Sequence, residues 1–139
     1  MKKLAITLVG MLSLLLAAGS AWAQNGTVRA NIPFSFTVNE QAALPAGVYT
    51  ITNADRGNTM LLIRGDGQSV IVLAQHAQKV QASDSTKLVF RSYGGSRYFL
   101  SEIWREGDSL GRRFPKSSLE KELAGNLKPN NVVVYAALR

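Results

Sequence analysis

Three carboxylates close together in the C-terminal half of the chain could do acid–base chemistry. Glu102, Glu106 and Asp108 are within seven residues of one another, and a pair of carboxyl groups is what glycoside hydrolysis requires. However, the strand pattern described below places Lys87 opposite Glu102 as an ion-pair partner, and the other two acids are on a glycine-flanked loop, where acids commonly serve solvation. We therefore expect no enzyme, and a small hydrolase is the less favoured alternative.

Other catalytic or metal-binding chemistry has little support. His76 is the only histidine, and the chain has no cysteine, so a metal site would need acidic ligands whose spacing nothing indicates. A serine nucleophile would have to use the same histidine, and the G-x-S-x-G turn is missing. The tripeptide Arg64-Gly65-Asp66 is interpreted as part of a turn and not as an adhesion motif. The sequence predicts no catalytic residue, no metal and no cofactor.

The densest basic cluster is a candidate binding site. Arg112 and Arg113, with Arg105 and Lys116 nearby, could hold a phosphate or carboxylate through paired N–H donors. The alternative is a solvated loop whose charges are paired with the neighbouring acids.

An aromatic surface is the second candidate. Tyr93, Tyr98 and Trp104, together with Arg91, fall on one face of a predicted hairpin and are residue types enriched at interfaces. In the alternative, a short helix near residues 117–124 packs over this face and buries Trp104. We expect Trp104 to be core, with the two tyrosines and Arg91 left exposed as a contact surface.

The hairpin that positions these residues is centred on Gly94-Gly95, between LVFRSY and SRYFLSEIW. A two-residue turn there sets Phe90 opposite Phe99 and Lys87 opposite Glu102. The core face would then hold Leu88, Phe90, Phe99 and Ile103. Beyond the hairpin, Ser117 and Glu120 match a capping box that begins a helix of about two turns.

The remaining elements are strands. Residues 28–38 alternate apolar and polar side chains, with Pro33 predicting an edge or a bulge. Further strands are predicted at 47–52, on both sides of a turn at Asp66-Gly67, and at 131–138. The hairpin at Asp66-Gly67 is apolar on both faces and should therefore be covered on both. With about seven strands and one short helix near the C-terminus, we expect an all-β fold, a single antiparallel sandwich or small barrel.

The first 23 residues have the pattern of a secretory signal peptide. Lys2 and Lys3 precede an apolar run, and Ala21-Trp22-Ala23 provides small residues before a cleavage point at Gln24. Cleavage would leave residues 24–139 as a single β domain that has no transmembrane segment and is exported to the periplasm or beyond. Its net charge would fall from +7 to +5. This moderate charge favours anionic surfaces or glycans, while an exported protein with scattered basic residues is not expected to bind nucleic acid.

The blocks IPFSFTVNEQAALPAGVYTI, LVFRSYGGSRYFLSEIW and GRRFPKSSLEKELA cover most of this domain. They resemble a group of small exported bacterial proteins that share I-P-F-x-F-x-V, L-P-A-G-x-Y and Y-F-L-S-E-x-W motifs and have no assigned activity. The resemblance implies export and one compact β domain, and it implies no catalytic residues. The leading hypothesis is a non-catalytic binding domain for an envelope component, such as a protein, a glycan or an anionic surface. The alternative is a small-barrel carrier of an apolar ligand.

Overall fold

The computed structural model describes residues 26–40, 43–57 and 59–139. The predicted signal peptide and its cleavage point lie outside the described residues. The described strands and helix, in chain order, are β1 (Val28–Ile32), β2 (Gly47–Asn53), β3 (Met60–Arg64), β4 (Ser69–Leu73), β5 (Gln75–Gln78), β6 (Lys87–Tyr93), β7 (Arg97–Trp104), β8 (Leu110–Arg113), α2 (Ser118–Ala124), β9 (Asn130–Tyr135) and β10 (Ala137–Leu138).

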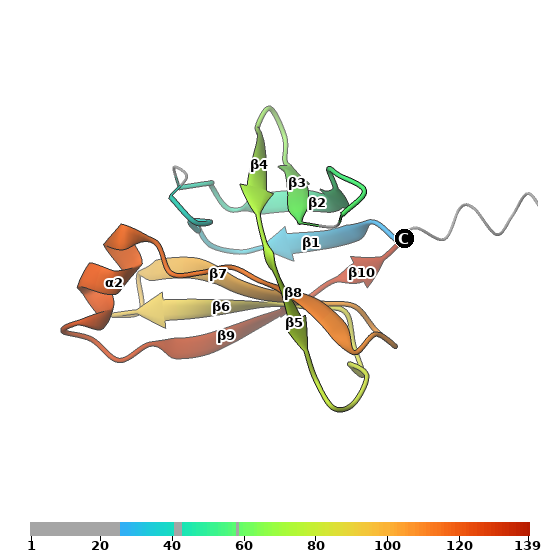
Figure 1. The fold of residues 1–139 in the computed structure, drawn as a ribbon. Coiled ribbons are helices and arrows are strands. Elements are labelled where there is room, and N and C mark those ends of the chain that lie inside the picture. The colour runs from blue at the N-terminus through green and yellow to red at the C-terminus, as the bar shows by residue number, and fades with distance from the viewer. Residues whose placement is uncertain (1–25, 41–42, 58) are drawn as a thin grey trace, which may run out of the picture.

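The strands form two antiparallel sheets of five strands each (Figure 1). Sheet 1 has the order β10-β1-β2-β3-β4, and sheet 2 has the order β5-β8-β7-β6-β9. The chain passes between the sheets where β4 runs into β5 through Ala74 and where β9 runs into β10 through Ala136. Edge strands of one sheet therefore continue as edge strands of the other, as at the corners of an orthogonal sandwich.

The all-β prediction is confirmed, but the predicted number of about seven strands is too low. The described residues form ten strands because the sequence predicts neither β5 nor β8, and the last predicted strand is divided into β9 and β10. Both missed strands are four residues long and mostly polar, so they carry little of the apolar alternation that indicates a strand.

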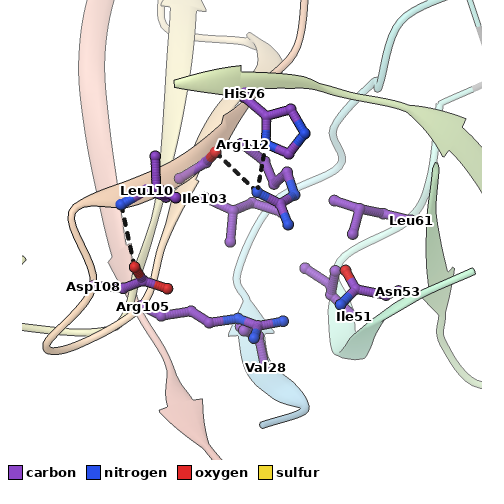
Figure 2. Close-up of a pocket in the computed structure, with 11 residues that line it drawn as sticks. Val28, Ile51, Asn53, Leu61, His76, Ile103, Arg105, Asp108, Leu110 and Arg112 are labelled. Atoms are coloured by element: carbon purple, nitrogen blue, oxygen red, sulfur yellow. Dashed lines mark hydrogen bonds between the residues drawn. The ribbon is translucent and has the colours of Figure 1, made fainter. Parts of the chain in front are cut away.

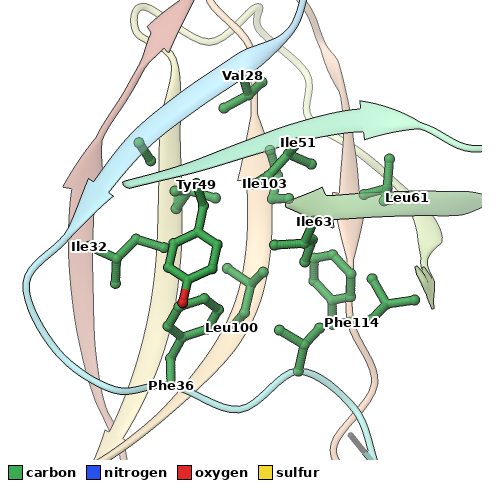
Figure 3. Close-up of a cluster of buried hydrophobic side chains, with 14 of the residues drawn as sticks. Val28, Ile32, Phe36, Tyr49, Ile51, Leu61, Ile63, Leu100, Ile103 and Phe114 are labelled. Carbon is green, nitrogen blue, oxygen red and sulfur yellow. The ribbon is translucent and has the colours of Figure 1, made fainter. Parts of the chain in front are cut away.

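The core fills the space between the two sheets (Figure 3). The alternation predicted for the first strand is seen in its burial: Val28, Ala30 and Ile32 point inward and the residues between them are exposed. β1 ends directly before Pro33, which cannot donate to a ladder. The buried apolar side chains with 0 or 1 % exposure include Ile63, Phe36, Val38, Leu88, Phe90 and Phe114.

The hairpin of β3 and β4 has the predicted register. Leu62 pairs with Ile71 and Ile63 pairs with Val70, with Asp66-Gly67 at the turn. The predicted cover on both faces is wrong, however. Ile71 is 57 % exposed on the outer face of sheet 1, while Ile63 on the inner face is buried.

The hairpin of β6 and β7 lies where predicted, but its register differs. Both turn glycines have positive φ, 64° at Gly94 and 74° at Gly95, as the prediction required. The loop has three residues instead of two, so Tyr93 pairs with Arg97 and Phe90 pairs with Leu100. A register irregularity after Val89 shifts the pairing again.

These two shifts change which side chains are in the core. Because one step of register reverses the face of every residue, Leu100 packs between the sheets and Phe99 lies on the outer face of sheet 2. Glu102 pairs with Val89, and Lys87 pairs with Trp104. The predicted pairing of Lys87 with Glu102 is therefore wrong.

Helix α2 packs on the outer face of sheet 2 through a buried ionic network. The N-cap prediction is confirmed, because the Ser117 hydroxyl accepts a hydrogen bond from the Glu120 backbone N–H. The Glu120 side chain, 2 % exposed, accepts hydrogen bonds from Arg91 Nε at 2.6 Å and from the Tyr93 hydroxyl at 2.8 Å. Arg91 also donates to the Ser101 hydroxyl at 2.7 Å, so the network joins the helix to both strands of the hairpin.

The Tyr93 hydroxyl gives this network a measurable dependence on pH. The pKa of Tyr93 is raised from 10.0 to about 12, mainly by burial. The hydrogen bond that Tyr93 donates to Glu120, and the negative charge of Glu120, also contribute to this rise. The folded protein thus holds this proton more tightly than the unfolded chain, so the stabilisation is complete below pH 10 and is lost as the pH rises from 10 to 12. We expect the free energy of unfolding to fall by about 2–3 kcal/mol over this window.

Urea unfolding at a series of alkaline pH values would measure this loss. The Tyr93→Phe variant has no such proton and should show a correspondingly flatter dependence between pH 10 and 12. Parallel curves for the two proteins would contradict the prediction.

Candidate functional site

A pocket of about 290 Å³ opens between the two sheets at one end of the domain (Figure 2). Its apolar wall consists of Val28 and Ile51 from β1 and β2, Leu61 from β3 and Ile103 from β7. These four side chains are part of the core, with exposures of 1–4 %. The pocket is therefore an open end of the space between the sheets, lined by core side chains.

Polar and charged side chains surround the mouth of this pocket. His76 on β5 and Arg112 on β8 are direct partners in the sheet, and Arg112 Nη1 lies 3.3 Å from His76 Nδ1. Arg105 and Asp108 come from the loop between β7 and β8, and Asn53 is at the end of β2. Figure 2 shows the guanidinium groups of Arg105 and Arg112 both directed into the pocket.

The electrostatic environment of Arg112 is unfavourable for a cation. Its Nη1 also donates to the Gly111 carbonyl at 3.2 Å, but its buried Nε has no hydrogen-bond partner within the described part of the chain. Burial, and then the positive charge of Arg105, lower the pKa of Arg112, and the negative charges of Asp108 and Asp55 only partly oppose this lowering. An arginine nevertheless stays protonated in proteins, so this site holds a positive charge that has no direct counter-ion within the described ranges.

The acidic residue at the mouth does not supply that counter-ion. Asp108 Oδ1 accepts a hydrogen bond from the Leu110 backbone N–H at 3.2 Å. Among the described residues, the one ion pair within 4.0 Å joins Arg91 and Glu120, far along sheet 2. The pocket thus combines two guanidinium groups, a free buried N–H donor and an apolar wall.

The structure separates the predicted basic pair. Because successive side chains of a strand point to opposite faces, Arg112 faces the pocket and Arg113 is exposed on the other side of β8. The two residues cannot hold one anion together. Arg105, which the sequence placed nearby in a supporting role, is the cation that shares the pocket with Arg112.

The predicted aromatic surface is largely buried. Trp104 and Tyr93 are each 1 % exposed, so the expected burial of Trp104 is confirmed and the expected exposure of Tyr93 is wrong. Arg91 is held in the ion pair with Glu120. Tyr98 is partly buried and stacks on Phe34 with ring centroids 3.8 Å apart.

Trp104 is also covered by residues other than those expected. Lys79 Nζ lies 4.0 Å from the centre of the Trp104 ring, and a side chain at Gly111 would come within 2.7 Å of that ring. The helix was expected to cover it, but Leu119 of that helix is 42 % exposed.

The three acids considered for hydrolysis do not converge. Glu102 accepts a hydrogen bond from Trp104 Nε1 at 2.7 Å, on the outer face of sheet 2. Asp108 lines the pocket between the sheets, and Glu106 is exposed. Within the described ranges, no three His, Cys, Asp or Glu side chains are grouped closely enough to hold a metal ion.

Sequence reasoning missed the pocket because β5 and β8 were not recognised. His76, which the sequence places in no predicted strand, is on β5 beside Arg112. The sequence contains only a weak indication of these two strands. In each, one small buried residue is next to the polar side chain, Ala77 beside His76 in β5 and Gly111 beside Arg112 in β8.

The geometry defines a class of protein, a two-sheet antiparallel β domain with a small cationic pocket at one end. Comparisons with protein-family models, with curated proteins and with solved structures found no significant match to the chain. In the described residues, no helix is both long and apolar enough to span a membrane.

Proposed function

We propose that this protein is a non-catalytic, exported binding domain whose pocket takes a small molecule with an anionic head and an apolar body. The observation that carries the proposal is Arg112, whose buried Nε has no hydrogen-bond partner among the described residues and lies at a pocket with one apolar wall. A carboxylate or phosphate accepts hydrogen bonds from a guanidinium group in a charge-assisted, often bidentate geometry. Such a head would supply the counter-ion that Arg112 lacks.

The wall and the size of the pocket support a ligand that is small and has an apolar body. Val28, Ile51, Leu61 and Ile103 offer an apolar surface that an inorganic ion would leave unused. The volume of about 290 Å³ is just below the range of about 300–1,000 Å³ that is usual for ligand sites, so the ligand must be small. The pocket therefore shares features with both binding hypotheses drawn from the sequence. Arg112 belongs to the predicted basic site, and the apolar wall is what a small-barrel carrier of an apolar ligand would need.

Calorimetric titration with three eight-carbon probes tests the proposal. Octanoate and octyl phosphate carry the anionic head, whereas octanol presents the same chain without charge. We expect one or both anions to bind and octanol to bind at least tenfold more weakly, since hydrogen bonds to charged groups contribute about 1.5–3 kcal/mol. Replacing Arg112 by methionine should weaken binding of the anions by a similar factor.

The chain offers a matched control in the neighbouring arginine. Arg113→Met removes the same charge from the exposed side of β8 and should leave binding unchanged. Equal binding of octanol and the anions would contradict the anionic part of the proposal. Equal loss in both variants, or no binding of either anion, would contradict the assignment of the pocket.

A further inference from the structure

The outer face of sheet 1 carries an exposed apolar patch that the pocket does not explain. On β3 and β4, Leu62 pairs with Ile71 and Met60 pairs with Leu73. These four side chains point away from the core, because their neighbours Leu61, Ile63 and Val72 are buried in it. Ile71 is 57 % exposed and Leu73 is 65 % exposed, so the patch faces solvent. We call these four residues the apolar rows.

Two arginines, Arg29 and Arg64, lie beside the apolar rows on the same face of sheet 1. Arg29 on β1 pairs with Thr50 on β2, and Thr50 pairs with Arg64 on β3. Neighbouring strands are about 4.8 Å apart, so the two arginines are separated by roughly 10 Å on the surface. Both arginines are exposed, and Arg64 is two residues along the strand from Leu62.

Among the described residues of this face, no carboxylate balances the two arginines. Asp66 is at the tip of the β3–β4 turn, beyond the last ladder pair. Asp55, in the β2–β3 loop, is engaged by hydrogen bonds from Thr59 and from the Met60 backbone N–H. The outward residues of the ladder are Arg29, Asn31, Val48, Thr50, Thr52, Met60, Leu62, Arg64, Ser69, Ile71 and Leu73.

We propose that this face binds the surface of a lipid bilayer that contains anionic headgroups. The apolar rows would enter the boundary between headgroups and acyl chains, and the arginines would contact lipid phosphates beside them. A second copy of the chain could cover the apolar rows, but the described part of the same face in that copy has no carboxylate to offer the arginines. An anionic bilayer satisfies both parts of the surface.

Co-sedimentation with vesicles tests this assignment. The wild-type protein should bind vesicles of phosphatidylcholine mixed with phosphatidylglycerol, and binding should weaken as salt is raised and be weaker to phosphatidylcholine alone. The double variant Ile71→Ser/Leu73→Ser should lose at least tenfold in partition coefficient. Arg29→Gln and Arg64→Gln should each lose about fivefold, since a basic residue near an anionic surface contributes about 1 kcal/mol.

Controls keep this result separate from folding and from the pocket. Tyr135 is 71 % exposed on β9 of the other sheet, so Tyr135→Ser is a matched surface change that should leave vesicle binding unchanged. The Arg112→Met variant should also bind vesicles normally, because its side chain faces the pocket between the sheets. Urea unfolding of each variant would show that the fold is retained.

Three results would overturn the proposal. The first is equal binding to neutral and anionic vesicles, and the second is no binding to either. The third is a concentration-dependent dimer in sedimentation velocity that the Ile71→Ser/Leu73→Ser variant abolishes, because a second copy would then occupy the face.

Discussion

Replacing Trp104 by alanine is expected to lower the free energy of unfolding by about 3–5 kcal/mol. The side chain is 1 % exposed, and its Nε1 donates to Glu102 at 2.7 Å. Its ring lies close to the backbone of Gly111, where an added Cβ would come within 2.7 Å. Truncation would leave a cavity between Lys79 and the backbone of Gly111.

Urea unfolding of the purified variants would measure this cost. Tyr135→Ala, which truncates an exposed aromatic residue on the same sheet, should change stability by no more than about 0.5 kcal/mol. Trp104→Phe should give an intermediate loss, because it keeps part of the packing but not the hydrogen bond. If Trp104→Ala left the unfolding curve unchanged while removing ligand or vesicle binding, Trp104 would be a contact residue and its burial would be refuted.

Replacing Glu120 by glutamine is expected to cost about 3 kcal/mol, the second large effect. The change keeps the size of the side chain but removes the negative charge that faces Arg91 at 2.6 Å. Arg91 would then remain mostly buried without a counter-ion, and the Tyr93 hydroxyl would lose a charged acceptor. Breaking a buried pair in this way costs more than removing both charges together.

A double-mutant cycle with Arg91→Met identifies the origin of the loss. The combined variant should be less destabilised than the sum of the two single variants, by at least about 1 kcal/mol. Glu122→Gln alters an exposed acid on the same helix and serves as the control for helix charge. Additive losses, or equal losses at Glu120 and Glu122, would show that the buried pair does not hold α2 on the sheet.

Several features of this protein follow from local sequence and were predictable. The register of the β3–β4 hairpin depends on Asp66-Gly67, since a short turn with the required backbone freedom sets the pairing of the strands it joins. The N-cap at Ser117 likewise depends only on a hydroxyl three residues before a free backbone N–H. In both cases, the interacting groups are neighbours in the chain.

The β6–β7 hairpin shows where local reasoning ends. Gly94-Gly95 correctly locates the turn, but the sequence does not state whether the loop has two or three residues. A loop that is longer by one residue moves every side chain of the paired strand to the opposite face of the sheet. The irregularity after Val89 moves the side chains beyond it back again. Packing against the opposite sheet selected the arrangement that buries Leu100 between the sheets.

The candidate pocket depends on tertiary structure alone. His76 and Arg112 are 36 residues apart in sequence, and they meet because β5 pairs with β8. Neither strand has enough apolar alternation to be recognised in the sequence. β5 reaches β8 because the chain continues from β4 through Ala74 into the second sheet. The sequence accordingly determined the all-β class, the turns and the helix cap through contacts between near neighbours. Only the closure of two sheets around one core decided which arginine faces solvent and which enters the pocket.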